Sequence, residues 1–147
     1  MEKIEGNTEV ATNVVNNGEN YAETAVSAHF SLNEFACNDG TEVPKKYRGN
    51  VQELMNNLEV IRNYFGGKPI VVNSGYRTAA YNKKVGGAAN SQHLTAKASD
   101  ITISGYTPKQ IGTAIIKLIS EGKLKEGGVG IYKTFVHYDI RGIKARW

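Results

Sequence analysis

The pattern of hydrophobic and polar positions predicts two helices in the chain. Apolar side chains recur at three- and four-residue spacing between Asn50 and Phe65, which is typical of a helix with one buried face. Asn50 is its expected N-terminal cap, and the two glycines after residue 65 are expected to end it. A second helix is predicted from Thr107, followed by a proline at the first helical position, to Gly122.

The same pattern predicts short strands around these helices. Strands are expected at residues 69–74, 99–104, 127–132 and 135–140. Residues 82–90 are rich in small side chains and predict a loop. The order is helix, strand, long loop, strand, helix and strand pair. This order indicates an α+β fold with a small antiparallel sheet and flanking helices.

The N-terminal part of the chain differs from the rest. Residues 1–27 are rich in Asn, Glu, Thr, Ala and Gly and have almost no large apolar side chains. Such a segment buries too little surface to offset its ordering entropy, so we expect a flexible tail or linker. Residues 28–147 are expected to form one domain, beginning with the apolar anchors Phe30, Leu32 and Phe35. The protein is expected to be a monomer or part of a larger particle attached through the tail.

Charge and cysteine content narrow the possible partners. The net charge is +4 and the sequence pI is about 9.1, which fits an acidic partner such as cell wall or nucleic acid, or simply a soluble surface. The Lys and Arg residues are scattered, so no nucleic-acid arm is expected. No stretch reaches the roughly 20 apolar residues of a membrane span. The single cysteine, Cys37, excludes an internal disulfide and is expected to be buried.

Two short segments carry the candidate chemistry. His93 is followed seven residues later by Asp100, and His137 is followed two residues later by Asp139. Two imidazoles and one carboxylate can hold a zinc ion and leave its fourth position open to water, as in catalytic sites. Iron, cobalt and copper remain alternatives to zinc. His29 stands far from both segments, before a packing motif, and is not expected to be a ligand.

With these motifs in view, the sequence resembles the zinc D-Ala-D-Ala carboxypeptidase family. That family belongs to the wider group of lysostaphin-type enzymes, D-Ala-D-Ala metallopeptidases and hedgehog domains. The resemblance covers about residue 29 to residue 147. It rests on Phe30-Ser31-Leu32-Asn33-Glu34-Phe35, Ser74-Gly75-Tyr76-Arg77, Asn82-x-x-Val85-Gly86-Gly87-Ala88, Ser91-x-His93-x6-Asp100 and Phe135-Val136-His137-x-Asp139, in the expected order.

The resemblance implies a fold, a cofactor and a ligand set. The fold would be like that of hedgehog domains and D-Ala-D-Ala peptidases. One Zn²⁺ per chain would be held by His93, Asp100 and His137. The zinc would activate a water molecule for peptide hydrolysis, and a carboxylate would accept the proton of that water.

The resemblance also implies a substrate-binding set. Arg77 would hold the carboxylate or the scissile carbonyl of the substrate, and Tyr76 is expected beside it. Ser91 and Gln92 would line the cleft. A surface ion pair is the alternative role for Arg77.

The sequence departs from the family pattern at two positions. Several branches place an acidic general base three residues before the last histidine ligand, where this chain has Thr134. The nearest carboxylate is Asp139, which is expected to be the catalytic base or a partner that orients His137. Ala96 stands where the family is expected to have glycine.

Two functions follow from the resemblance. The first is a zinc metallopeptidase that cuts stem or cross-link peptides of peptidoglycan, at D-Ala-D-Ala or at a nearby bond. The alternative is a catalytically impaired, zinc-containing module that binds cell wall or forms part of a virion or other particle. The N-terminus lacks the apolar core of a signal peptide. We therefore expect synthesis in the cytoplasm and action on the wall after lysis or particle delivery, as in a phage endolysin.

Overall fold

A computed structural model of the protein describes residues 12–14, 20–22 and 24–147. In chain order its elements are β1 (Thr12–Val14), β2 (Asn20–Ala22), η2 (Leu32–Phe35), η3 (Lys45–Tyr47), α1 (Arg48–Tyr64), β3 (Ile70–Ser74), α2 (Ala79–Lys84), η4 (Gln92–Thr95), β4 (Ala98–Ile103), α3 (Pro108–Ser120), β5 (Gly128–Ile131), β6 (Val136–Asp139) and β7 (Ala145–Arg146). The elements marked η are short 3-10 helices. None of the helices in the described ranges is long and apolar enough to cross a membrane.

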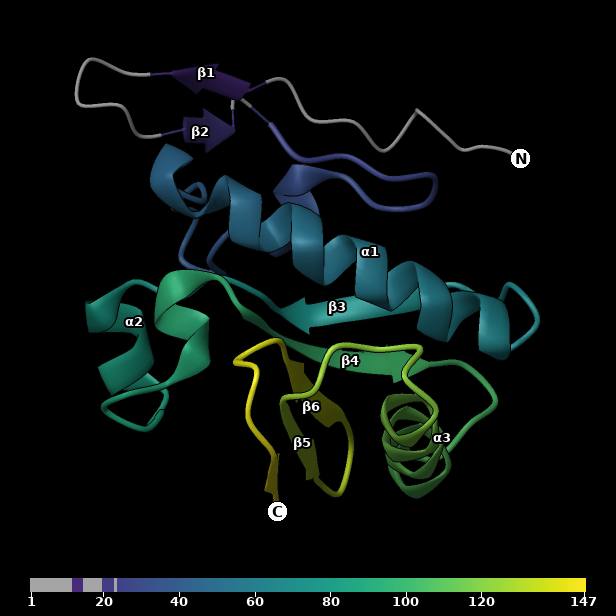
Figure 1. Ribbon diagram of the computed structural model, residues 1–147. Coiled ribbons are helices and arrows are strands. Elements are labelled where there is room, and N and C mark those ends of the chain that lie inside the picture. The colour runs from purple at the N-terminus through teal and green to yellow at the C-terminus, as the bar shows by residue number, and fades with distance from the viewer. Residues whose placement is uncertain (1–11, 15–19, 23) are drawn as a thin grey trace.

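The main sheet has five strands in the order β3-β4-β6-β5-β7 (Figure 1). The predicted strands all form and pair antiparallel, which confirms the α+β class. The sheet is nevertheless mixed, because the short β7 adds to the edge of β5 in parallel. That strand was not predicted, since two residues are too few to show a period.

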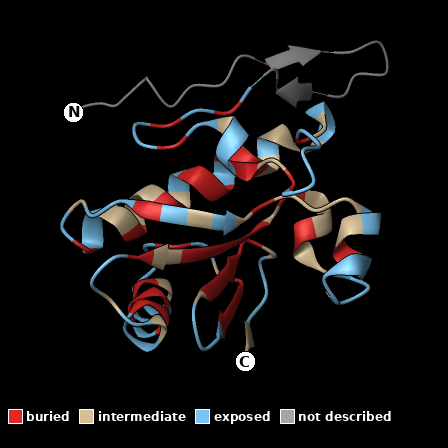
Figure 2. Ribbon diagram, turned by 180° about the vertical axis from the view of Figure 1, so that it is seen from behind, coloured by how far each residue is buried: buried red, intermediate tan, exposed pale blue. Residues whose placement is uncertain are grey.

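The two faces of the sheet carry different kinds of side chain. Ile101, Val136 and Tyr138 alternate to one face and belong to the core cluster that also contains the buried sides of α1 and α3. Buried residues are concentrated in the central strands in Figure 2. Asp100 and His137 point to the other face and lie directly opposite each other on β4 and β6. One face therefore stabilises the domain, and the other presents the candidate chemistry.

The predicted helices form, with one change at a start. α1 begins at Arg48 rather than after Asn50, because the preceding 3-10 helix η3 leads the chain directly into it. The Asn50 side chain instead donates to the Thr95 carbonyl oxygen at 2.9 Å. The glycine pair ends α1 as predicted, with φ of 72° at Gly66 and 82° at Gly67. Thr107 caps α3 by accepting a hydrogen bond from the Gln110 backbone N–H at 3.1 Å.

Part of the predicted loop at residues 82–90 is helical. α2 is capped by Thr78, whose hydroxyl accepts from the Tyr81 N–H at 3.1 Å. Asn82 is buried within this helix and donates to the Ala88 carbonyl oxygen at 2.9 Å. A Cβ at Gly87 would collide with the Asn82 side chain, so the close approach requires glycine. Because α2 has only six residues, its period is too short to recognise.

Most of the predicted flexible tail, residues 1–27, lies outside the described residues. Within them, β1 pairs antiparallel with β2. Ala25 is buried, and the Val26 N–H donates to Gln52 Oε1 of α1 at 3.0 Å. Contact with the domain thus begins slightly before residue 28. Phe30, Phe35 and Cys37 are buried, as predicted.

Candidate metal centre and substrate cleft

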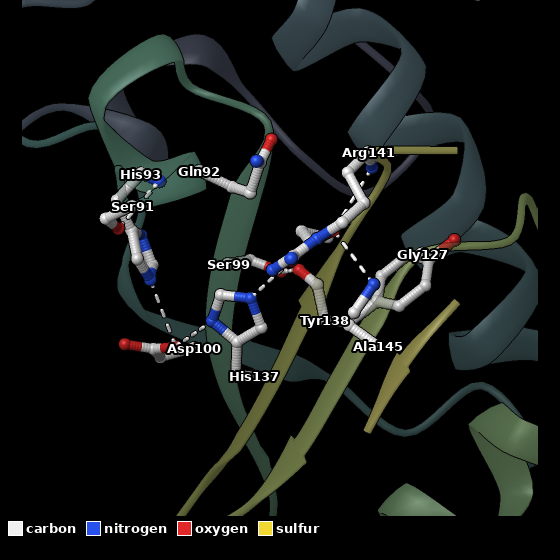
Figure 3. Close-up of polar contacts among 12 residues, drawn as sticks. Ser91, Gln92, His93, Ser99, Asp100, Gly127, His137, Tyr138, Arg141 and Ala145 are labelled. Carbon is white, nitrogen blue, oxygen red and sulfur yellow. Dashed lines mark hydrogen bonds and ion pairs between the residues drawn. The ribbon is translucent and has the colours of Figure 1, made fainter. Parts of the chain in front are cut away.

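The two candidate segments meet on the face of the sheet that lies opposite the core cluster. Asp100 comes from β4, His137 from the facing position of β6, and His93 from the 3-10 helix η4 that precedes β4. One ligand atom from each of these three residues lies within 4.8 Å of the other two. Figure 3 shows both imidazole rings turned toward the Asp100 carboxylate. The structure thus brings together all three residues of the expected ligand set.

The backbone around η4 holds His93 in place. The Ser91 hydroxyl caps the helix by accepting from the His93 N–H at 3.1 Å. The Arg77 N–H donates to the His93 carbonyl oxygen at 3.0 Å, which ties η4 to the end of β3. The helix ends at Ala96 in the left-handed conformation, with φ of 60° and ψ of 31°. Glycine adopts this conformation most easily, which is a physical reason why glycine is expected at the position of Ala96.

Hydrogen bonds to the outer nitrogens fix the tautomers of both histidines. His93 Nδ1 lies 2.7 Å from the Gly75 carbonyl oxygen, which only accepts, so Nδ1 carries the proton. His137 Nε2 donates to Asp139 Oδ2 at 2.7 Å. This leaves His93 Nε2 at 3.2 Å and His137 Nδ1 at 3.3 Å from Asp100 Oδ1. Three electron-pair donors then face one another, an arrangement that a shared cation stabilises and that fits zinc.

The pKa values of the ligand residues favour charges of opposite sign. Burial alone would raise the pKa of Asp100, but the neighbouring imidazoles of His137 and His93 hold it well below its usual range. Asp100 is therefore an anion at neutral pH. Burial alone would lower the pKa of His137, but Asp100 and Asp139 raise it above its usual value. Both pKa shifts show that the carboxylates of Asp100 and Asp139 stabilise positive charge among the candidate ligand residues.

Asp139 lies behind His137 and is fully buried. Its Oδ1 accepts from the backbone N–H groups of Gly128 and Arg141 at 2.9 and 3.1 Å and from Arg141 Nε at 2.9 Å. Its Oδ2 accepts from His137 Nε2 and from Arg141 Nη2, both at 2.7 Å. These donors hold the pKa of Asp139 well below its usual range, although burial alone would raise it. Of the two expected roles, this geometry favours the partner that orients His137.

Arg77 is held by three acceptors of its own chain. Nε donates to the Ser74 hydroxyl at 3.2 Å, Nη1 to Asn82 Oδ1 at 3.1 Å, and Nη2 to Asp100 Oδ2 at 3.2 Å. The last of these is a partly buried ion pair rather than the surface pair considered as the alternative. Arg77 therefore orients Oδ2 of Asp100 and leaves Oδ1 facing His93 and His137.

A cleft of about 450 Å³ opens above the three ligand residues. Arg77, Ser91 and Gln92 line it, and their contacts with a substrate stay a prediction. Tyr76 is not among its lining residues; its ring packs 6.1 Å from that of Tyr47 instead. Thr134 is exposed in the turn between β5 and β6 and also stands outside the lining.

Two further cleft residues were missed from the sequence, Arg141 and Trp147. The Trp147 ring lies 4.9 Å from the His137 ring, and its Nε1 donates to the Tyr132 hydroxyl at 2.6 Å. Gly130 faces His137 across the strand pair, and a Cβ there would collide with the indole. Arg141 continues the two-residue spacing of His137 and Asp139, which is the signal that could have identified it. Trp147 follows β7, whose position the sequence did not predict.

Comparison with known proteins agrees with this geometry. Residues 28–139 match the family model of peptidase M15, which is more than half of the chain. The zinc D-Ala-D-Ala carboxypeptidase of Streptomyces albus G is 43% identical over 54 residues, covering 37% of this chain and 21% of that protein. The chain thus aligns with about a fifth of that relative's length. Because the family match includes all three candidate ligand residues and spans most of the folded part, the chain belongs to the peptidase M15 family.

Proposed function

We propose that the chain is a zinc-dependent peptidase that hydrolyses a peptide bond in the stem or cross-link peptides of peptidoglycan, in the manner of a D-Ala-D-Ala carboxypeptidase. The observation that carries this proposal is the convergence of His93, Asp100 and His137 at the base of a cleft, with their ligand atoms within 4.8 Å of one another. The name of the similar Streptomyces protein supports both the metal and the substrate class.

His93 Nε2, Asp100 Oδ1 and His137 Nδ1 are the proposed zinc ligands. When bound, zinc supplies an activated water, whose pKa falls toward about 7, and polarises the scissile carbonyl. The chain keeps these three atoms in place through outer contacts: Gly75 fixes His93, Arg77 fixes Asp100, and Asp139 fixes His137. Such contacts orient ligands and raise their basicity.

The cleft residues are proposed to position the peptide. Arg77 keeps unused N–H groups beside Asp100, which support a hydrogen bond to the scissile carbonyl oxygen as negative charge develops there. Ser91 and Gln92 line the same cleft and are proposed to contact the peptide backbone. Action on the wall after lysis or particle delivery, and attachment through residues 1–27, stay predictions.

One observation favours a second candidate function. Among the described residues that line the cleft, Asp100 is the one carboxylate, and it is a proposed metal ligand. Asp139 is buried and saturated with hydrogen bonds, and Thr134 lies outside the cleft. This arrangement would suit a zinc-containing module that binds cell-wall peptides without cutting them.

Defined muropeptides incubated with the purified protein test the proposal. Mass spectrometry of the products would be compared for the zinc-loaded protein, the protein treated with a chelator, and the chelated protein after zinc is restored. Loss of a terminal D-Ala that stops with the chelator and returns with zinc supports carboxypeptidase action, and a split cross-link supports endopeptidase action. Intact muropeptides in the presence of stoichiometric zinc would overturn the peptidase proposal and leave the binding module.

A further inference from the structure

The cleft contains two guanidinium groups, and their hydrogen bonds differ. Arg77 uses all three of its nitrogens on its own chain, at Ser74, Asn82 and Asp100. Arg141 uses Nε and Nη2 on the carboxylate of Asp139. Within the part of the chain that the structure describes, its Nη1 donates to no acceptor. Both N–H bonds of Nη1 are thus free for a ligand, on the side of the guanidinium away from the Nε and Nη2 atoms that bind Asp139.

Arg141 is held in a fixed orientation. Asp139 binds it at two points, with distances of 2.9 and 2.7 Å, and its guanidinium carbon lies 5.5 Å from the centre of the Trp147 ring. The lack of a side chain at Gly128 makes room for this pair, since a Cβ there would lie 2.9 Å from Arg141 Nη2. A guanidinium fixed in this way loses little conformational entropy when it binds a ligand.

Arg141 is also accessible from the cleft. Its side chain is 26% exposed, against 15% for Arg77, and it lines the cleft together with His137 and Trp147. A planar cation with free N–H groups, beside an aromatic wall and next to the proposed zinc ligand, is suited to a carboxylate.

We propose that Arg141 is the specificity-determining residue that binds the free carboxylate of the substrate next to the scissile bond, while Arg77 serves the metal centre and the scissile carbonyl. This inference rests on the proposed function for its substrate. It assigns the carboxylate to Arg141 and thereby chooses, of the two roles expected for Arg77, the contact with the scissile carbonyl.

The test compares two peptides and three proteins. The peptides are an acylated D-Ala-D-Ala peptide and the same peptide with its C-terminal carboxylate converted to an amide. The proteins, all saturated with zinc and checked for metal content, are the wild type, Arg141→Gln and Arg146→Gln. Arg146 is the matched control, because it also forms an ion pair near the C-terminal end, with Glu126 at 2.9 Å, but does not line the cleft.

Calorimetry measures the equilibrium binding of the acid peptide and of the amide peptide. Where cleavage occurs, kcat and KM give the preference for the acid peptide as well. The wild type and Arg146→Gln are expected to bind the acid roughly 10- to 100-fold more tightly than the amide, as for a hydrogen-bonded ion pair. Arg141→Gln is expected to bind both peptides equally, at the affinity that the wild type has for the amide. Arg141→Lys, which keeps the charge opposite Asp139, is a second variant that should also lose most of the preference.

Equal binding of acid and amide by the wild type would overturn the proposal, and so would an undiminished preference in Arg141→Gln. If Arg141→Gln lost affinity for both peptides equally and kept the preference for the acid peptide, Arg141 would have a role in folding alone. That result would also contradict the proposal. Because binding is measured separately from cleavage, a protein that prefers the acid but cuts neither peptide would refute the peptidase proposal and support the role of Arg141.

Discussion

At the scale of single residues, Asp139 connects the metal centre to the rest of the sheet. It is fully buried, and its six hydrogen bonds join His137 to Arg141 and to the backbone of β5. A carboxylate used in this way has no lone pair left for the proton of an attacking water. Its proposed role is to keep His137 Nε2 protonated and Nδ1 free for zinc.

We therefore predict that Asp139→Asn weakens zinc binding. The amide would no longer fix the tautomer of His137, and loss of such an outer contact typically costs about 10- to 100-fold in metal affinity. Competition with a chromogenic chelator measures the zinc dissociation constant. Asp39→Asn, in an exposed turn where Asp39 accepts from the Thr41 N–H, is the control and should bind zinc as the wild type does. Unchanged affinity with lost turnover in Asp139→Asn would instead identify Asp139 as the catalytic base.

The sequence allowed much of the site to be predicted at this scale. The convergence of His93, Asp100 and His137 could be predicted because metal-binding side chains are few in type and the motif spacing is specific. Arg141 could not be assigned, because its role depends on which of its nitrogens Asp139 occupies. The contact of Trp147 with His137 depends on the missing side chain at Gly130, which only the register of β5 against β6 reveals.

At the scale of elements, Glu59 joins α1 to the segment before η2. Its carboxylate accepts from the Ser27 hydroxyl at 2.5 Å and from the His29 N–H and Nδ1, each at 2.7 Å. Burial alone would raise the pKa of Glu59, but these hydrogen bonds hold it below its usual value. The lower pKa in the folded state means that the ionised carboxylate stabilises the fold.

We predict that Glu59→Gln lowers the free energy of unfolding at pH 7 by about 1.5–3 kcal/mol, the usual contribution of hydrogen bonds to a charged group. Because the folded-state pKa is the lower one, this contribution is complete above the ordinary pKa of glutamate. It is lost as the pH falls through the folded-state value. Urea unfolding of both proteins at pH 7 and near pH 3 measures the difference, which should shrink at the lower pH.

Glu53→Gln provides the matched control on the same helix. Glu53 pairs with Lys125 at 2.9 Å, but both side chains are more than 40% exposed. Such a pair contributes about 0–1 kcal/mol. An equal effect of the two substitutions, or an effect of Glu59→Gln that grows as the pH falls, would contradict the prediction.

The elements themselves were predictable in proportion to their length. α1 and α3 have 17 and 13 residues, enough turns for their apolar period to be recognised. α2 has six residues and depends on the hydrogen bond of the buried Asn82. β7 has two residues and depends on its pairing with the edge of β5. The start of α1 was misplaced because Asn50 hydrogen-bonds to Thr95, which is 45 residues away.

At the scale of the whole molecule, the proposed zinc site joins parts of the chain that are far apart in sequence. Its ligands come from η4, β4 and β6, and its outer contacts reach the end of β3 and β5. An ion that binds the folded state and not the unfolded chain stabilises the fold by mass action.

We predict that zinc raises the melting temperature. At a free zinc concentration 100 times the dissociation constant, the free energy of unfolding should rise by about 2.7 kcal/mol. For a domain of this size, that corresponds to a rise in melting temperature of roughly 5–15 °C. Scanning calorimetry of the zinc-loaded and chelated protein measures the shift. His93→Ala should abolish the shift, whereas His29→Ala, outside the cluster, should retain it. An equal shift in both variants would place the zinc elsewhere.

The position of Trp147 has a consequence for measurement. It is the one tryptophan of the sequence, and its ring lies 4.9 Å from the ring of a proposed zinc ligand. Indole fluorescence responds to nearby charge and to quenching by protonated imidazole, so the protein carries its own optical reporter of metal occupancy. Titration with zinc should change the emission of the native protein and reach a plateau at one ion per chain. The same signal can then follow metal uptake and release in real time, without a dye or a substrate.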